Sequence, residues 1–277
     1  MGNALLNKNY NRVWEIDFIR GFAVLLMVFD HLMFLISDIF GPAWKYADFN
    51  NIAVLENFYS FANNYTYGEL RAAVEPYIAN LFILICGLSS NLSKNNFKRG
   101  YLLLLFSFVL SLLSYYFVND WFIHFGVISA LSFSILIYEF INRLVNKNKK
   151  AVFIAGLVLM LSLVIGNYYI TKNHIAAPNK YCGFLTEEWA AQLRFSSNGD
   201  FFPLFPSLAA FLLGSVLGAL FYPNKKSLVP KLNCFLTKPV NLVGRHAIYY
   251  YIIPQAFFIL LFCIISYTSV TGTWIFF

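Results

Sequence analysis

The sequence predicts an all-α integral membrane protein, a bundle of about seven transmembrane helices with a cytoplasmic N-terminus and an extracytoplasmic C-terminus. Hydrophobic residues make up 59% of the 277 residues, charged residues only 12%, and the mean hydropathy is +0.63. Soluble domains have a far larger charged share, about a quarter. The apolar runs are about 16 to 21 residues long, which is helix length, whereas barrel strands alternate over about ten residues. Backbone groups in lipid must bond internally, so these runs predict helices.

Each predicted span is an apolar run with polar or basic flanks. The seven spans are 16–37, 77–92, 101–118, 121–140, 152–170, 203–221 and 247–267. The second is predicted to have Pro76 in its first turn, where a missing N–H is harmless. Only residues 118–120 separate the third and fourth spans, which predicts an antiparallel hairpin. Pro254 removes a hydrogen bond within the seventh span and predicts a bend there.

The distribution of basic residues predicts the orientation, because cytoplasmic loops retain Lys and Arg. With the N-terminus inside, 15 of the 20 basic residues fall on the cytoplasmic side and five on the other. The first span carries acids and a histidine and has no small-residue cleavage site, so it is not predicted to be a removable signal. We expect a multi-pass protein of the plasma (cytoplasmic) membrane with a single transmembrane domain over residues 1–277.

Several classes of partner are disfavoured by the composition. The net charge of +7 lies in short loops between spans, where topology explains it, so no nucleic acid is expected. The four cysteines show no CxxC or Cys/His ligand spacing, so neither disulfides nor a metal site is expected. Membrane lipids are expected partners, and the sequence leaves a homodimer open.

Ionisable residues within the first span carry the strongest functional signal. Each such group near a bilayer centre costs a few kcal/mol or more. At about 100° per residue, Arg20 and His31 lie within about 20° of one line and about 16 Å apart along the helix. Asp17 and Asp38 fall within about 60° of that line, so these four residues form a predicted polar stripe. Asp30 points about 100° away from His31 and must have a separate partner.

Two interpretations of the polar stripe remain open. An arginine facing a cavity suits bidentate phosphate contacts, and histidine is the usual proton acceptor near neutral pH. Alternatively, Arg20 and Asp17 serve only to lock helices together, with Arg20 extended toward the interface. For His31 the functional interpretation is preferred, because a structural role rarely needs a titratable group at that depth.

The stripe begins a series of blocks that resemble the heparan-alpha-glucosaminide N-acetyltransferase-like (DUF1624-type) bacterial membrane proteins of the transmembrane acyltransferase group. The similar blocks, in family order, are IDFIRGFAVLLMVFDH, PYIANLFILICGLSSNLSKNNFKRG, HFGVISALS, GDFFPLFPSLAAFLLGSVLGALFY and VNLVGRHAIYYYIIPQ. Residues 41–75 and 171–198 match least. One departure is Pro254, which stands before Gln255 where relatives commonly have histidine.

The resemblance implies an enzyme that takes an acetyl group from cytosolic acetyl-CoA, its co-substrate, and delivers it to an amine or hydroxyl of an extracytoplasmic glycan. His31 is then the expected catalytic residue, as general base or as acetylated nucleophile. Arg20, Arg99 and Arg245 are the expected CoA-binding residues, although topogenic charge explains the last two equally well. An extended pantetheine arm is of the same order as the roughly 16 Å rise from Arg20 to His31.

The remaining candidates lie around the predicted outer mouth or within helices. Nine acids against five basic residues on that side favour a cationic amine acceptor. Asp38, Asp200 and His124 are the expected acceptor-binding residues, although a histidine at an interface is often only an amphipathic belt residue. Asp17, Asp30 and Gln255 are expected in structural, supporting roles.

Gly214 and Gly218 form a small-xxx-small face that predicts close helix packing in the sixth span. Two rival functions remain. A transporter or flippase would use the polar stripe to relay protons or guide a polar substrate. A structural or sensory subunit would bind neither CoA nor glycan.

Overall fold

The computed structural model describes residues 13–93, 95–117, 123, 125–179, 181–193, 201–232 and 234–270, and within these its regular elements are all helical. Seven helices there are long and apolar enough to cross a membrane. They are Trp14–Tyr46, Glu69–Ser90, Asn96–Tyr116, Val127–Leu144, Lys149–Lys172, Leu204–Phe221 and Ala247–Thr268. The predicted seven-helix class is therefore confirmed, and the orientation of the termini stays a prediction.

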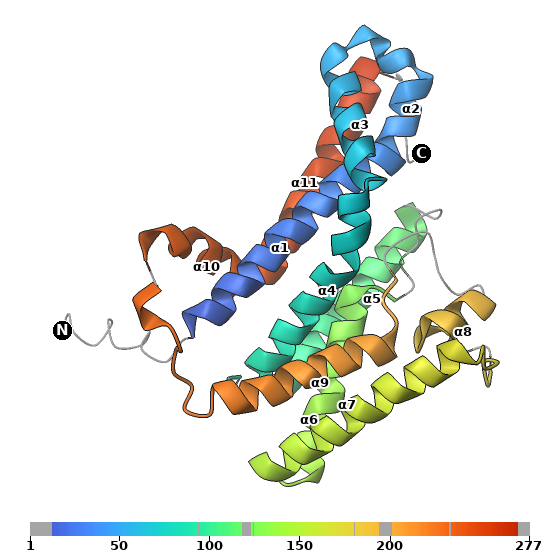
Figure 1. Cartoon of the computed structure of the whole chain (residues 1–277). Helices are drawn as coiled ribbons and strands as arrows, with labels where there is room; N and C mark the ends of the chain where they lie inside the picture. Colours follow the sequence, from blue (N-terminus) through green and yellow to red (C-terminus); the bar gives the residue numbers. More distant parts are fainter. Residues whose placement is uncertain are drawn as a thin grey trace. The chain divides into compact units, whose positions relative to one another are not determined.

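The helices and their connecting elements follow one another along the chain (Figure 1). In order they are α1 (Trp14–Phe34), a π-helix (Leu35–Phe40), α2 (Gly41–Tyr46), a 3-10 helix (Asp48–Asn51), α3 (Ala53–Thr66), α4 (Glu69–Ser90), α5 (Asn96–Phe117), α6 (Val127–Leu144), α7 (Lys149–Lys172), a 3-10 helix (Cys182–Phe184), α8 (Glu187–Gln192), α9 (Leu204–Phe221), 3-10 helices (Pro230–Leu232 and Phe235–Thr237), α10 (Lys238–Arg245), α11 (Ala247–Ile265) and a π-helix (Ser266–Val270).

The chain divides into two compact units. The α1 unit comprises residues 14–82 and 229–277, and the α9 unit comprises residues 1–13 and 83–228. The first part of α4 belongs to the α1 unit and its last part to the α9 unit. The prediction of a single transmembrane domain over residues 1–277 stays a prediction.

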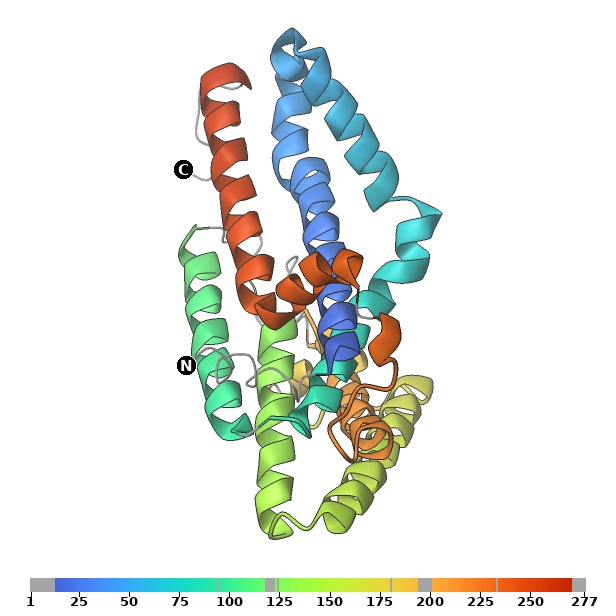
Figure 2. The same cartoon turned by 90° about the vertical axis from the view of Figure 1, so that its left-hand side faces the viewer.

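Within the α1 unit, α1 packs against α10 and α11, which follow each other in the chain (Figure 2). The contact with α10 is a close backbone approach through two glycines. A Cβ on Gly21 would meet the carbonyl oxygen of Val240, and a Cβ on Gly244 would meet that of Asp17. The absence of side chains at both positions therefore lets the two backbones touch, as in small-residue packing between membrane helices.

Further along the α1 unit, aromatic side chains fill the space between the π-helix, α2 and α11. Phe40 is fully buried and its ring contacts those of Trp44 and Phe262, at centroid distances of 5.9 and 5.5 Å. The indole N–H of Trp44 donates to the hydroxyl of Ser266 at 2.7 Å. Burial of these large rings stabilises the end of the unit, and the indole keeps the hydrogen-bond partner it needs when buried.

In the α9 unit, α4 and α9 approach each other through glycines. A Cβ on Gly214 would meet the carbonyl oxygen of Leu84, and one on Gly218 would lie 2.6 Å from that of Leu88. Gly87 faces the backbone of Phe211 in the same way. The predicted small-xxx-small packing is confirmed, with α4 as its partner.

Two predicted boundaries are wrong. The second span begins at Glu69, so Pro76 lies inside α4 rather than in its first turn. Residues 69–75, ELRAAVE, are strong helix formers, and their polarity hid that propensity from a hydropathy argument. The fourth span begins at Val127, because Gly126 is extended and the backbone of Phe125 accepts a hydrogen bond from Phe202 at 2.8 Å. The predicted three-residue turn at 118–120 lies outside the described residues.

Candidate functional site

The Trp14 end of α1 holds a cluster of one acid and two arginines. Arg20 Nη1 donates to Asp17 Oδ1 and to the carbonyl oxygen of Gly244, both at 3.2 Å. Arg245 Nε lies 3.4 Å from Asp17 Oδ2. Asp17 thus binds both cations, and the Gly21–Gly244 contact brings α10 close enough for this. The structure brings together Arg20 and Arg245, which the sequence placed far apart in the chain.

Exposure differs between the two arginines. The side chain of Arg20 is 13% exposed and that of Arg245 is 38% exposed. The buried Nε of Arg20 has no hydrogen-bond partner among the described residues. A guanidinium has five donors in a planar fork, so Arg245 in particular retains donors for an anion after its contact with Asp17.

His31 is held by two hydrogen bonds within the α1 unit. Its Nδ1 lies 2.8 Å from the carbonyl oxygen of Met27, and its Nε2 lies 3.2 Å from the hydroxyl of Tyr251 on α11. A carbonyl can only accept, so Nδ1 carries the proton and neutral His31 presents its basic lone pair at Nε2. The Tyr251 hydroxyl then donates to Nε2. One of the two partners of His31 thus lies on its own helix and the other on α11.

Apolar side chains separate the two ends of the predicted polar stripe. Val24 and Met27 are buried on α1 between Arg20 and His31, and they pack against Val243, with Ala247 and Tyr251 beside them. Arg20 and His31 do face the consecutive helices α10 and α11. An apolar cluster fills the line between them on this face, so the predicted polar stripe is interrupted between Arg20 and His31.

Asp30 binds Arg71 through both carboxylate oxygens. Arg71 Nε donates to Oδ1 at 2.7 Å and Nη2 donates to Oδ2 at 3.1 Å. The hydroxyl of Tyr65 adds a bond to Oδ1 at 3.3 Å, and Arg71 Nη1 lies 3.4 Å from the carbonyl of Thr66. The predicted separate partner for Asp30 is confirmed. Its identity, Arg71 on α4, was missed because residue 71 was assigned to a loop.

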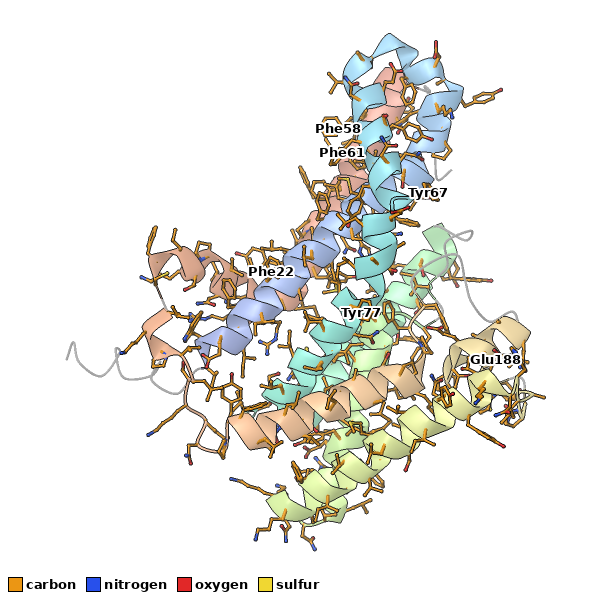
Figure 3. All side chains as sticks on the ribbon, in the orientation of Figure 1. Phe22, Phe58, Phe61, Tyr67, Tyr77 and Glu188 are labelled. Atoms are coloured by element: carbon orange, nitrogen blue, oxygen red, sulfur yellow. The ribbon has the colours of Figure 1, made fainter. Side chains whose placement is uncertain are left out.

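Asp38 lies in the π-helix that continues α1, and its contacts are with the α3 side. Its carboxylate accepts from Tyr67 and from Ser37, each at 2.5 Å, and Ser37 also donates to Thr66 at 3.0 Å. Tyr67 follows the last turn of α3 (Figure 3). The hydrogen bond to Asp38 raises the pKa of the Tyr67 phenol above its ordinary value.

This position corrects the predicted alignment of Asp38 with Arg20 and His31. A π-helix closes i to i+5 hydrogen bonds, so its residues no longer advance by the α-helical angle on which the prediction rested. Asp38 therefore turns toward Tyr67 rather than toward α11. Its predicted contact with the acceptor stays a prediction.

Gln255 lies one helical turn beyond Tyr251 on α11. Its buried Nε2 has no hydrogen-bond partner among the described residues. A buried amide without a partner is unusual in a folded protein, because desolvation of the donor is not offset. Gln255 and Tyr251, four residues apart, share one face of α11. The prediction assigned Gln255 only a supporting role.

The other predicted site residues lie elsewhere. Arg99 is on α5, in the α9 unit, and is partly buried. His124 and Asp200 lie outside the described residues. Across the part of the chain that the structure describes, no three His, Cys, Asp or Glu side chains are grouped to hold a metal ion.

A family model for the catalytic region of heparan-alpha-glucosaminide N-acetyltransferase matches the chain in two overlapping segments, residues 12–50 and 46–256. The matched residues include α1 to α10 and the first half of α11. Comparisons with curated proteins and with solved structures give no match.

Proposed function

The chain belongs to the heparan-alpha-glucosaminide N-acetyltransferase catalytic family, and from this premise we propose that it moves an acetyl group from cytosolic acetyl-CoA to an extracytoplasmic sugar. The family and the seven apolar helices make it a multi-pass membrane protein with an acetyltransferase-type function. Three points belong to the proposal: that the donor is acetyl-CoA, that the acceptor is an amine or hydroxyl of a glycan, and that the membrane is the plasma membrane. The observation that carries the proposal is His31, an imidazole with a fixed tautomer inside the first span.

The proposed role of His31 Nε2 is to remove a proton from the acceptor amine or hydroxyl. The acceptor atom attacks the thioester carbonyl carbon, the C–S bond then breaks, and the imidazolium returns its proton to the CoA thiolate. The Met27 carbonyl supports this role, because it keeps Nδ1 protonated and so keeps Nε2 basic. Tyr251 must release Nε2 before the acceptor can occupy its place.

Gln255 is the proposed donor to the thioester oxygen. As the acceptor attacks, negative charge develops on that oxygen, and a preorganised N–H donor stabilises it most in a water-excluded site. The Gln255 Nε2 is buried and without a partner among the described residues, and it lies on the Tyr251 face of α11. Both features support a donor that bonds to substrate rather than to protein.

Arg20 and Arg245 are the proposed anchors for the CoA phosphates. Guanidinium groups bind phosphate through paired N–H donors, and Asp17 holds both arginines at one end of α1. His31 lies about 16 Å further along the helix, a span comparable to an extended pantetheine arm. The arm must pass the apolar cluster of Val24, Met27 and Val243 rather than follow a polar channel on that face.

The test is acetyl-CoA turnover by purified, folded protein in which His31 is replaced by glutamine. We expect H31Q to lose about 10²- to 10⁴-fold in rate, the usual contribution of a general base. The matched control is H174Q, which removes a histidine from the loop between α7 and α8. Undiminished turnover in H31Q would exclude the proposed role.

Two further readouts separate the chemical roles. A burst of free CoA, equal to the enzyme present and formed without acceptor, would identify an acetylated His31 instead of a general base. Replacing Gln255 with alanine is expected to lower kcat by about 10²-fold or more with little change in KM, because the bond strengthens only in the transition state. A change in KM alone would contradict the oxyanion role.

A further inference from the structure

The segment from Val229 to Arg245, the last residue of α10, exposes both basic and apolar side chains. We define this basic ridge by its exposed side chains, which are Lys231, Leu232, Phe235, Leu236, Lys238, Leu242 and Arg245. Phe235 is 78% exposed and Leu236 is 82% exposed, far more than large apolar side chains usually are. Exposed apolar side chains gathered in one short segment beside cations indicate an interaction site.

The basic ridge is fixed to α1 at both ends. The indole N–H of Trp14 donates to the carbonyl of Val229 at 3.2 Å. At the other end, Gly244 touches the backbone of Asp17, and Asn241 and Val243 are buried. At helical spacing, Lys238 and Leu242 lie on the face of α10 opposite the one that packs against α1, while the side chain of Arg245 contacts Asp17 of α1. The ridge is therefore held against α1, and of its charged side chains Arg245 also contacts Asp17.

All the charged side chains of the basic ridge are basic. Every acid of the chain lies at or before Asp200, so residues 201–277 contain no Asp or Glu. The ammonium of Lys238 lies 5.9 Å from the ring centroid of Phe235, which places a cation beside the most exposed aromatic side chain of the ridge. The ridge leads directly into the membrane span that begins at Ala247. It therefore lies where a bilayer surface lies.

We propose that the basic ridge docks into the headgroup region of the adjoining leaflet and binds anionic phospholipids. Phe235 and Leu236 enter the boundary between headgroups and acyl chains, as the apolar faces of interfacial elements do. Lys231 and Lys238 bind lipid phosphates, because clustered cations beside a span attract anionic headgroups. The occupant is a lipid surface, since exposed apolar side chains interleaved with cations match both parts of it. The inference needs neither acetyl-CoA nor a glycan.

The depth of Cys234 in the bilayer tests the proposal directly. Cys234 is exposed between Leu232 and Phe235, so a nitroxide there reports on the ridge. The full chain, with its other three cysteines replaced, is placed in nanodiscs of phosphatidylcholine with and without phosphatidylglycerol. With phosphatidylglycerol we expect collisions with an aqueous nickel complex to fall several-fold and collisions with oxygen to rise. The same label on Cys182 alone, in the loop before α8, is the control. Equal exposure of both labels to the nickel complex overturns the proposal.

Charge variants then identify the lipid contact. K231Q/K238Q should lose the effect of phosphatidylglycerol, while K147Q/K150Q, which removes equal charge at the join of α6 and α7, should keep it. Equal loss in both variants overturns the proposal, because bulk charge would then explain the effect. Protection of the label by acetyl-CoA but not by phosphatidylglycerol also overturns it and assigns the surface to the donor. This experiment measures label accessibility and not acetyl transfer. Its result can therefore be interpreted even if the proposed acetyltransferase function is wrong.

Discussion

The buried carboxylate of Asp30 requires a cationic partner, and Arg71 is that partner. Asp30 is 9% exposed within the first span, where an unpaired charge is costly. Arg71 supplies a planar fork that matches both carboxylate oxygens, and Tyr65 adds a third donor. The pair therefore fixes the start of α4 to α1. His31, the next residue, points to a different helix.

Replacement of Arg71 by methionine should destabilise the protein by about 3 kcal/mol, because it leaves Asp30 charged and without its main partner. The measurement is unfolding of the purified protein in detergent. R143M is the matched control, since the Arg143–Glu139 pair has an arginine side chain that is 56% exposed, and its loss should cost below about 1 kcal/mol.

The double variant D30N/R71M should recover part of the loss, because no charge is then left unpaired. Similar losses in R71M and R143M would mean that the Asp30–Arg71 pair behaves as an ordinary surface pair.

At the scale of elements, the contact between α1 and α10 decides which polar groups meet. Gly21 and Gly244 let the helix backbones touch, and that approach sets Arg20 beside the Gly244 carbonyl and Arg245 beside Asp17. The π-helix after α1 separates polar groups instead, since it turns Asp38 away from His31 and toward Tyr67 at the end of α3. Helix packing and helix geometry thus set the partners of three ionised groups on one span.

Replacement of Gly244 by alanine should push α10 from α1 and destabilise the protein by about 1 to 3 kcal/mol, the usual cost of overpacking. If the two arginines hold CoA, it should also raise KM for acetyl-CoA, measured by turnover. G166A is the control, because a Cβ at Gly166 of α7 meets nothing within 4 Å. We expect G166A to be neutral or slightly stabilising. Equal stability of both variants would contradict the close contact.

At the scale of the whole molecule, the number of spans constrains the termini. Seven crossings, an odd number, predict that the two ends of the chain lie on opposite sides of the membrane. The charge of the loops predicts that the N-terminus is inside, with 15 basic residues on the predicted cytoplasmic side and five on the other. An acetyl donor from the cytosol also needs Arg20 and Arg245 to face that side.

Two cysteines allow the orientation to be measured. Cys182 lies on the predicted outer side and Cys234 on the predicted inner side, and both are free. A membrane-impermeant maleimide should label Cys182 in intact cells and Cys234 only after the membrane is dissolved in detergent. C182S and C234S variants assign each signal, because Cys86 is buried. The reverse pattern would overturn the predicted orientation and, with it, the cytosolic position of the donor arginines.

The sequence by itself determined the membrane class, the seven spans, the family and the need of Asp30 for a partner. These follow from local quantities, namely apolar run length, the cost of a charge in lipid and the order of residues in the chain. It also indicated the glycine face of α9, because only small residues permit such an approach.

Only the tertiary structure decided which groups meet. Asp30 pairs with Arg71, and the Tyr251 hydroxyl bonds to His31. Val24 and Met27 pack between Arg20 and His31, and Asp38 bonds to Tyr67. A regular helix predicts directions at a fixed angle per residue, but the π-helix changes that angle and neighbouring helices choose the contacts. Partner identity is a property of packing between distant segments, and no local pattern contains it.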